Sequence, residues 1–241
     1  MVITLKNDDS NDEKYDPKNI QLSRSQWILL AVFGAISGGA VGQIIDNAYP
    51  MSGALHYHNA ILVPFFGQVL EFVWFVPILY ITAGALIAIL ITLLSKLFNR
   101  ETGTVLDGWI RRKPRGGNNP SWIFTISSIL IFVLQWFLGC HLSIFVPNAW
   151  LFAILVLWGL LIWWIFDGTD AGLILCLMVA ALGPLIEFTL INVFGFYHYT
   201  NPDMFGVPFW FVGHYIGGTP GNMNLARKYL AFLHDRGTKN N

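Results

Sequence analysis

Glu187 is the residue best placed to do chemistry in this sequence, because it lies deep in an apolar run, ALGPLIEFTLIN. A carboxylate buried in lipid is by default a functional candidate. It is equally compatible with a structural role, either protonated or hydrogen-bonded to a helix that Pro184 interrupts. As a proton carrier it would suit a small transporter or proton-coupled permease, although no Lys or Arg lies deep in an apolar run to pair with it. Transport is therefore kept as the alternative function.

Histidines form the second candidate group, and four of the six lie in or beside the connections expected to face outward: His56, His58, His141 and His198. Imidazoles that converge can bind zinc. Histidine is also common at membrane interfaces beside Tyr and Trp, so we predict no metal site. The sequence contains no nucleophile, metalloprotease or phosphate-binding motif, and we predict neither an enzyme nor a cofactor.

Transmembrane helices are the elements that must position these residues. Of the 241 residues, 55% are hydrophobic and 12% are charged, with a mean hydropathy of +0.56, whereas about a quarter of residues are charged in soluble proteins. Six continuous apolar runs, at residues 27–45, 68–98, 122–142, 149–166, 172–194 and 205–226, fit helical spans of about 20 residues. Their continuity disfavours a barrel of alternating strands. The second run exceeds one span, so its start predicts an interfacial or tilted stretch.

Basic residues fall in three segments only: four in residues 1–25, six in residues 96–115 and four in residues 227–239. With six spans these segments share one side of the membrane, which the positive-inside rule assigns to the cytosol. We predict an all-α, polytopic six-helix bundle with cytosolic termini, composed of a flexible tail (1–25), a membrane domain (26–230) and a C-terminal tail (231–241). The formal net charge is zero, and nothing indicates nucleic-acid binding.

Two of the predicted spans carry glycine stripes at helical spacing, one at Gly34, Gly38 and Gly42 and the other at Gly213, Gly217 and Gly221. Such stripes let another backbone approach closely. Packing inside the bundle is the favoured interpretation, with a homo-oligomer interface or the wall of a lipid site as alternatives. Pro184 and Pro220 kink their helices, which favours a cavity between bent helices.

Three motifs occur in a fixed order: WWIFDGTDAGLIL from Trp163, YHYTNPDMFGVPFW from Tyr197 and GGTPGNMNLAR from Gly217. They resemble the fourth connection, the segment before the last span and the Gly-rich ending of the INSIG (insulin-induced gene) family. Weaker similarity extends the match over residues 27–230. The chain is thus identified as a divergent member of that family.

The resemblance implies a function as well as a six-helix fold with cytosolic termini. Eukaryotic INSIG proteins lie in the endoplasmic reticulum, bind oxysterols and hold a sterol-sensing-domain partner, the SREBP escort protein or HMG-CoA reductase. Bacterial relatives bind diacylglycerol-like lipid. The resemblance therefore implies a non-enzymatic regulator of sterol and lipid homeostasis, in the endoplasmic reticulum of a eukaryote or the plasma membrane of a bacterium.

The resemblance also implies site residues. Asp167 matches the family's Asp that matters for escort-protein binding, and Trp150 stands where animal members have a polar Gln. On this basis we expect partner binding at Asp167, Phe166 and Trp164, and lipid binding at Trp150, Trp163, Gly38, Gly42 and Glu187. Residues 168–171, GTDA, replace the family's basic Arg-Ser-Arg-Ser.

Overall fold

The structure is a computed structural model that describes residues 14–16, 20–99 and 109–239. Its long helices are α2 (Arg24–Asp46), α4 (Phe75–Phe98), α5 (Trp122–Leu142), α6 (Asn148–Phe166), α7 (Asp170–Asn192) and α8 (Phe211–Lys239). The shorter elements are α3 (Ala48–Ser52), β1 (Leu55–Tyr57), β2 (Ile61–Phe65), β3 (Gln68–Phe72) and β4 (Tyr197–Tyr199).

Five helical segments of the described chain are long and apolar enough to cross a membrane: Arg24–Ser52, Phe75–Phe98, Trp122–Leu142, Asn148–Phe166 and Asp170–Asn192. They correspond to the first five predicted spans. Helix α8 is not among them, because its middle carries polar and charged residues such as Asn222, Asn224 and Arg227. A sixth crossing by α8 and cytosolic termini stay predictions.

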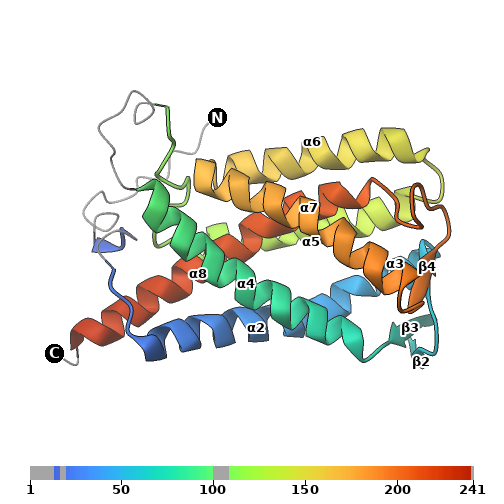
Figure 1. Ribbon diagram of the computed structural model, residues 1–241, viewed down its shortest axis with the longest axis horizontal. Helices are drawn as coiled ribbons and strands as arrows, with labels where there is room; N and C mark the ends of the chain where they lie inside the picture. The colour runs from blue at the N-terminus through green and yellow to red at the C-terminus, as the bar shows by residue number, and fades with distance from the viewer. Residues whose placement is uncertain (1–13, 17–19, 100–108, 240–241) are drawn as a thin grey trace.

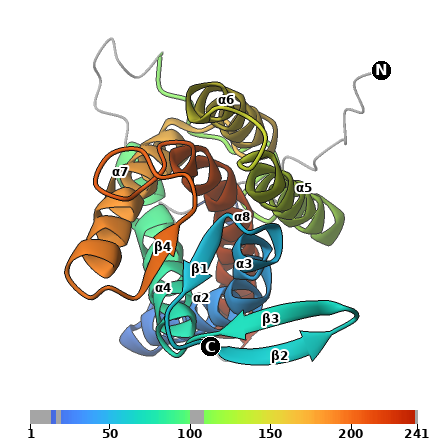
Figure 2. The same cartoon turned by 90° about the vertical axis from the view of Figure 1, so that its right-hand side faces the viewer.

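Helix α8 nevertheless lies at the centre of the bundle, in contact with α2, α4, α5, α6 and α7 (Figure 1). Seen along the bundle, α5 and α6 lie on one side of α8, and α2 and α4 lie on the other (Figure 2). One buried apolar cluster surrounds Tyr49 and Trp136, and a second surrounds Ile91, Leu175 and Met223. The least apolar long helix is therefore the one most enclosed by its neighbours.

Side-chain caps fix where several helices begin. Ser23 and Gln26 form a capping box at the start of α2, and the hydroxyl of Ser121 accepts a hydrogen bond from the Phe124 amide at the start of α5. Such caps satisfy amide groups that have no partner inside the helix. Helix α6 ends before Gly168, whose φ of +71° suits glycine, and the Thr169 hydroxyl then caps α7.

Both glycine stripes pack inside the bundle, as the favoured interpretation has it. A Cβ atom on Gly38 would lie 2.2 Å from the Tyr80 carbonyl oxygen of α4. A Cβ atom on Gly213 would lie 2.5 Å from the Leu155 backbone of α6. Glycine is thus required where α2 meets α4 and where α8 meets α6, because any side chain would push the helices apart.

The fold is mostly helical, and the all-α prediction is corrected by two small antiparallel sheets. Strand β1 pairs with β4, and β2 pairs with β3. The start of the apolar run at residues 68–98 is therefore strand β3, and the spanning helix begins only at Phe75. The tight turn is formed at Phe66 and Gly67, whose φ angles are +46° and +77°, and positive values at both central residues are typical of a two-residue hairpin.

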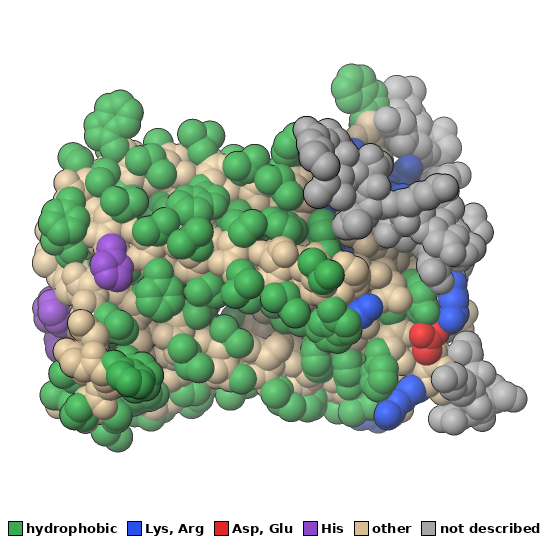
Figure 3. Space-filling view, turned by 180° about the vertical axis from the view of Figure 1, so that it is seen from behind, with side chains coloured by type: hydrophobic (Ala, Val, Ile, Leu, Met, Phe, Trp, Pro, Cys, Tyr) green, Lys and Arg blue, Asp and Glu red, His purple; other side chains and the backbone are tan. Residues whose placement is uncertain are grey.

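The two ends of the molecule differ in charge. Lys and Arg side chains gather at the end where α8 finishes, whereas His side chains gather at the opposite end (Figure 3). At the basic end, Lys14 Nζ lies 2.7 Å from Asp235 Oδ1, and Tyr15 and Ile20 are buried against Leu230 of α8. These two residues of the predicted 1–25 tail are therefore packed on the bundle, while residues 1–13 and 17–19 lie outside the described residues. Helix α8 likewise continues through the predicted boundary at residue 230.

Candidate functional site

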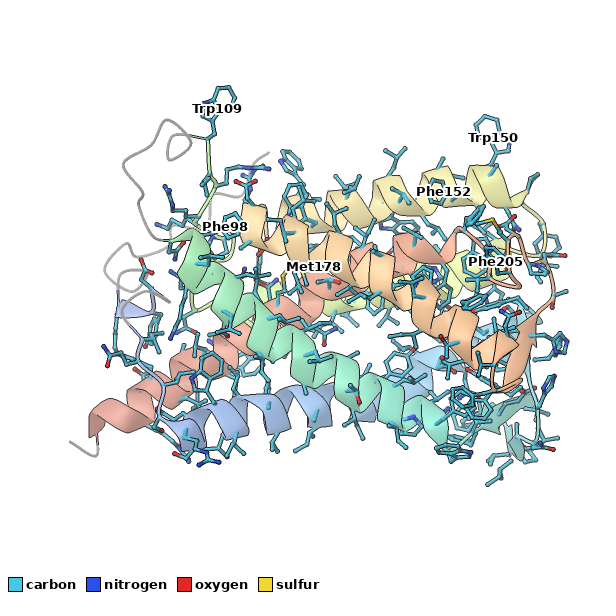
Figure 4. The ribbon with its side chains drawn as sticks, in the orientation of Figure 1. Phe98, Trp109, Trp150, Phe152, Met178 and Phe205 are labelled. Atoms are coloured by element: carbon cyan, nitrogen blue, oxygen red, sulfur yellow. The ribbon has the colours of Figure 1, made fainter. Side chains whose placement is uncertain are left out.

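An apolar cavity of about 350 Å³ lies between α2, α4, α5, α7 and α8. Its wall extends from Phe75 to Leu90 on α4 and from Phe211 to Leu225 on α8. At a helical rise of 1.5 Å per residue these stretches are roughly 20 Å long, which exceeds the roughly 15 Å of one hydrocarbon leaflet. Met178 of α7 lines the cavity and lies near the middle of the bundle (Figure 4). The cavity is therefore long and apolar enough for a lipid chain.

Glu187 marks the polar end of this cavity. Its Oε2 atom accepts hydrogen bonds from the hydroxyls of Tyr197 and of Tyr199, the latter at 3.0 Å, and its Oε1 atom accepts one from the Tyr215 hydroxyl at 3.1 Å. Glu187 is 8% exposed. Because Tyr197 and Tyr199 come from β4 and Tyr215 comes from α8, one carboxyl ties three elements together at the end of the cavity.

Asp46, the last residue of α2, is a second carboxyl in the same wall. Its Oδ2 atom accepts a hydrogen bond from the Tyr57 hydroxyl, and its Oδ1 atom accepts one from the Tyr80 hydroxyl at 3.2 Å. On the remaining wall, the Tyr49 hydroxyl and His214 Nδ1 are 3.1 Å apart. Two carboxyls and six tyrosines thus surround one end of an otherwise apolar cavity.

The sheet tyrosines keep their protons. Burial, and after it the Glu187 carboxyl, raises the pKa of Tyr197 and of Tyr199 well above the ordinary value. Burial, and after it Asp46, does the same to the pKa of Tyr57. A phenol with a raised pKa stays neutral at physiological pH. These hydroxyls therefore act as hydrogen-bond donors to the carboxyls.

Strand pairing brings these tyrosines to the cavity. Tyr57 on β1 is the register partner of Tyr197 on β4, and Leu55 is the partner of Tyr199. Sequence reasoning singles out Glu187 as a site residue but none of the tyrosines. The available signal was the alternation HYH at residues 56–58 and YHY at residues 197–199, which is typical of strands with one buried face.

Three of the five expected lipid-binding residues lie in the cavity wall: Gly38, Gly42 and Glu187. Trp150 does not, because it projects from the outer side of α6, away from the bundle, and is 69% exposed (Figure 4). Trp163 is buried outside the cavity wall, where its indole nitrogen donates a hydrogen bond to the Thr169 carbonyl oxygen at 3.1 Å. Contact of Trp150 and Trp163 with a lipid stays a prediction that the cavity does not support.

The residues expected to bind a partner lie together at the turn between α6 and α7, but they differ in access. Asp167 is fully buried, and its Oδ1 atom lies 2.5 Å from Arg227 Nη2 of α8. Phe166 is also buried, against the ring of Phe124. Trp164 is 50% exposed. Of the three, only Trp164 presents a surface that a partner can contact directly.

Asp167 instead positions the turn. Its Oδ2 atom accepts hydrogen bonds from the Thr169 amide at 3.0 Å and from the Thr169 hydroxyl at 2.7 Å. Its carbonyl oxygen accepts one from the Arg115 amide at 2.8 Å. The carboxylate therefore joins the α6–α7 turn to α8, and the Asp167 backbone joins the turn to the basic connection that precedes α5.

Three of the four candidate histidines come together on or beside the sheet formed by β1 and β4, called the outer sheet below. His56 and His198 are register partners, and His58 Nε2 lies 3.1 Å from His198 Nδ1. His141 is separate, since its Nδ1 atom bonds the Phe137 carbonyl oxygen within α5. Within the described residues, no group of three or more His, Cys, Asp or Glu has the arrangement of a metal site.

Comparison with known proteins identifies the family to which the chain belongs. Residues 24–229 match the family model for insulin-induced protein (INSIG), and no curated protein matches the chain. The chain is similar to the crystal structure of MvINS, a mycobacterial Insig homolog from Mycobacterium vanbaalenii, with a TM-score of 0.64 and 19% identity over 88% of this chain and 97% of that one. A cross-linked trimer of an MvINS variant gives a TM-score of 0.63 at 19% identity, with the same coverage of 88% and 97%. Because the family model spans most of its length, the chain belongs to the INSIG family.

Proposed function

We propose that this chain is an INSIG-type regulator that binds a sterol or diacylglycerol-like lipid in the cavity between its helices. Family membership supports a membrane regulator of this type. The observation that carries the lipid proposal is the cavity of about 350 Å³, which is apolar along its length and polar at one end. Ligand sites commonly combine apolar walls with a few placed polar groups, and an amphiphilic lipid matches both parts.

Lipid occupancy would act on a partner through α7 and α8. Both helices line the cavity, and both are tied at the basic end by Asp167, Thr169 and Arg227. A ligand changes a conformational equilibrium only to the extent that it binds the two states differently. A lipid that favours one separation of α7 and α8 would therefore bias the α6–α7 turn, where Trp164 is exposed to a sterol-sensing membrane partner.

We also propose an orientation in the membrane, a compartment and an assembly of copies. The basic end matches the cytosolic side of the positive-inside rule, with the outer sheet facing the lumen or exterior. The membrane is that of the endoplasmic reticulum in a eukaryotic host and the plasma membrane in a bacterial one. Assembly of copies is proposed only by likeness to the cross-linked MvINS trimer.

Replacing Met178 with Trp is expected to weaken lipid binding by at least about tenfold, or 1.4 kcal/mol, because the larger side chain takes up part of the cavity that Met178 lines. The matched control is Leu185→Trp on the same helix, since Leu185 is 61% exposed and does not line the cavity. Saturable binding of radiolabelled oxysterol and diacylglycerol to the purified protein is the measurement. If both variants lost binding to the same extent, or if neither lost any, the cavity would not be the lipid-binding site.

A further inference from the structure

We propose that the polar end of the cavity selects a positively charged headgroup, so that the cavity takes a long-chain amine as a ligand. The inference rests on the proposed lipid-binding function of the cavity and names a class of ligand beyond sterols and diacylglycerol. Three observations carry it: the charge of the lining, the hydrogen-bonding character of the polar end and its aromatic wall.

The two carboxyls of the lining have no cationic side chain in the described part of the cavity wall. Asp46 and Glu187 both line the cavity, and among the described residues in its wall none is Lys or Arg. The buried ion pair elsewhere in the protein shows the usual arrangement, in which Asp167 is paired with Arg227. A carboxyl buried without a cationic partner tends to stay protonated, and a cation beside it favours the ionised form. An ammonium group entering the cavity would supply the positive charge that the wall lacks.

The polar end is also rich in acceptors. The hydroxyl protons of Tyr57 and Tyr80 are directed to Asp46, and those of Tyr197, Tyr199 and Tyr215 to Glu187. A phenol that donates its proton keeps oxygen lone pairs as acceptors. An ammonium group carries three donors and no acceptor, so its hydrogen bonds match this end of the cavity. A carboxylate or phosphate headgroup would instead compete with the two carboxyls for the tyrosine hydroxyl protons.

Aromatic rings complete the polar end. The ring centroids of Tyr57 and Tyr197 are 5.5 Å apart, those of Tyr197 and Tyr199 are 6.0 Å apart, and those of Phe75 and Tyr197 are 6.0 Å apart. All four side chains belong to the cavity wall. Ring faces attract cations, and the attraction is largest where water is excluded. The wall therefore adds to the preference that the two carboxyls create.

The apolar remainder of the cavity sets the shape of the ligand. Beyond the tyrosines its wall is mostly apolar, with Leu86, Leu90 and Leu175 among its members and a few neutral polar side chains such as Thr82 and Asn222. With a wall roughly 20 Å long by the helical rise, the cavity accommodates much of a long alkyl chain. The ligand is therefore a single-chain amine, with its head at the outer sheet and its chain along the helices.

The test compares three probes that differ only in headgroup: radiolabelled octadecylamine, octadecanol and octadecanoate. Saturable binding is measured on the full chain in nanodiscs of zwitterionic lipid, each probe being competed by its own unlabelled form. We expect octadecylamine to bind at least about tenfold more tightly than octadecanol, because charge-assisted hydrogen bonds are about twice as strong as neutral ones. We expect octadecanoate to bind the most weakly.

Two variants test whether the preference for the amine over the alcohol comes from the two carboxyls. Glu187→Gln and Asp46→Asn are each expected to weaken octadecylamine binding about tenfold while changing octadecanol binding less than about threefold. The matched control is Asp203→Asn, since Asp203 does not line the cavity and its carboxyl accepts hydrogen bonds from Asn148 and the Phe209 amide, which lie outside the cavity wall. A melting curve of each variant reports folding, and the ratio of amine to alcohol binding in the unaltered protein tests the proposal even if both variants fail to fold.

The outcomes separate this inference from the function on which it rests. Saturable binding of octadecanol or diacylglycerol without preference for the amine would overturn the inference and leave the proposed function standing. Amine binding that is unchanged in both cavity variants would also overturn it. Absence of saturable binding by every lipid probe would overturn the proposed function and the inference together.

Discussion

Replacing Asp167 with Asn is expected to lower the free energy of unfolding by about 3–5 kcal/mol, because it leaves Arg227 as an uncompensated buried charge. Asp167 is fully buried, and its Oδ1 atom lies 2.5 Å from Arg227 Nη2. Asn keeps the shape of the side chain and one acceptor for the Thr169 hydroxyl. The loss of unfolding free energy therefore measures the effect of removing the negative charge. Reversible unfolding of the purified protein in mixed micelles measures it.

The control for this prediction is an exposed pair on the same turn. Asp170 Oδ1 lies 3.6 Å from Arg111 Nη2, and both side chains are partly exposed, so Asp170→Asn is expected to cost at most about 1 kcal/mol. The double change Asp167→Asn with Arg227→Met is expected to recover part of the loss, because a neutral replacement of a buried pair is often tolerated. If Asp167→Asn cost no more than Asp170→Asn, the structural role of this ion pair would be wrong.

The second large effect is expected from Gly38→Ala, which should destabilise the protein by about 1–3 kcal/mol through overpacking. The added methyl group would lie 2.2 Å from the Tyr80 carbonyl oxygen, and neither helix backbone can move aside without separating α2 from α4. Ala has the higher helix propensity by about 1 kcal/mol, so a loss cannot come from propensity. The measurement is the same unfolding equilibrium.

Gly39→Ala is the matched control, one residue along the same helix. A Cβ atom there would meet the Ile81 side chain at 2.6 Å, and a side chain can change rotamer where a backbone cannot. We expect a clearly smaller loss than for Gly38→Ala. Equal effects at the two positions would mean that the close contact between α2 and α4 does not determine packing here.

The helical part of the fold was predictable because membrane spans are continuous apolar runs, a local property of the sequence. Five of the six runs match helices long enough to cross a membrane. The failure at the start of the second run has a physical cause. Strand β3 has only five residues, QVLEF, and is followed by an apolar helix within a few residues. In so short a segment periodicity alone does not distinguish a strand from the start of a helix.

The site was predictable only where a single residue carried the signal. Glu187 was found because a carboxyl in an apolar run is unusual. Its partners were not, since Tyr215 comes from another helix and Tyr197 and Tyr199 reach it only once β1 and β4 pair. The burial of Asp167 was missed for the same reason: access depends on Arg227 of α8, a tertiary contact that the local pattern does not contain.

Helix α8 connects the cavity to the α6–α7 turn, which gives a route for regulation by a bound lipid. Lipid binding is proposed between α2, α4, α5, α7 and α8, and the buried Asp167–Arg227 pair joins α8, just beyond its cavity-lining stretch, to the turn that exposes Trp164. The Asp167 variant is therefore expected to lose partner binding through loss of turn structure. If the partner contacts Trp164 directly, Trp164→Ala is expected to lose partner binding while the stability of the protein stays unchanged.

Photolabelling tests the central claim, lipid binding inside the bundle, most directly. A photoreactive sterol or diacylglycerol is bound to the protein in nanodiscs, irradiated with and without excess unlabelled lipid, and the labelled peptides are identified by mass spectrometry. We predict saturable label on buried cavity-lining residues such as Val76, Ile87 and Leu175. Label confined to outward-facing residues such as Trp150 and Leu185, and not reduced by competitor, would contradict the claim.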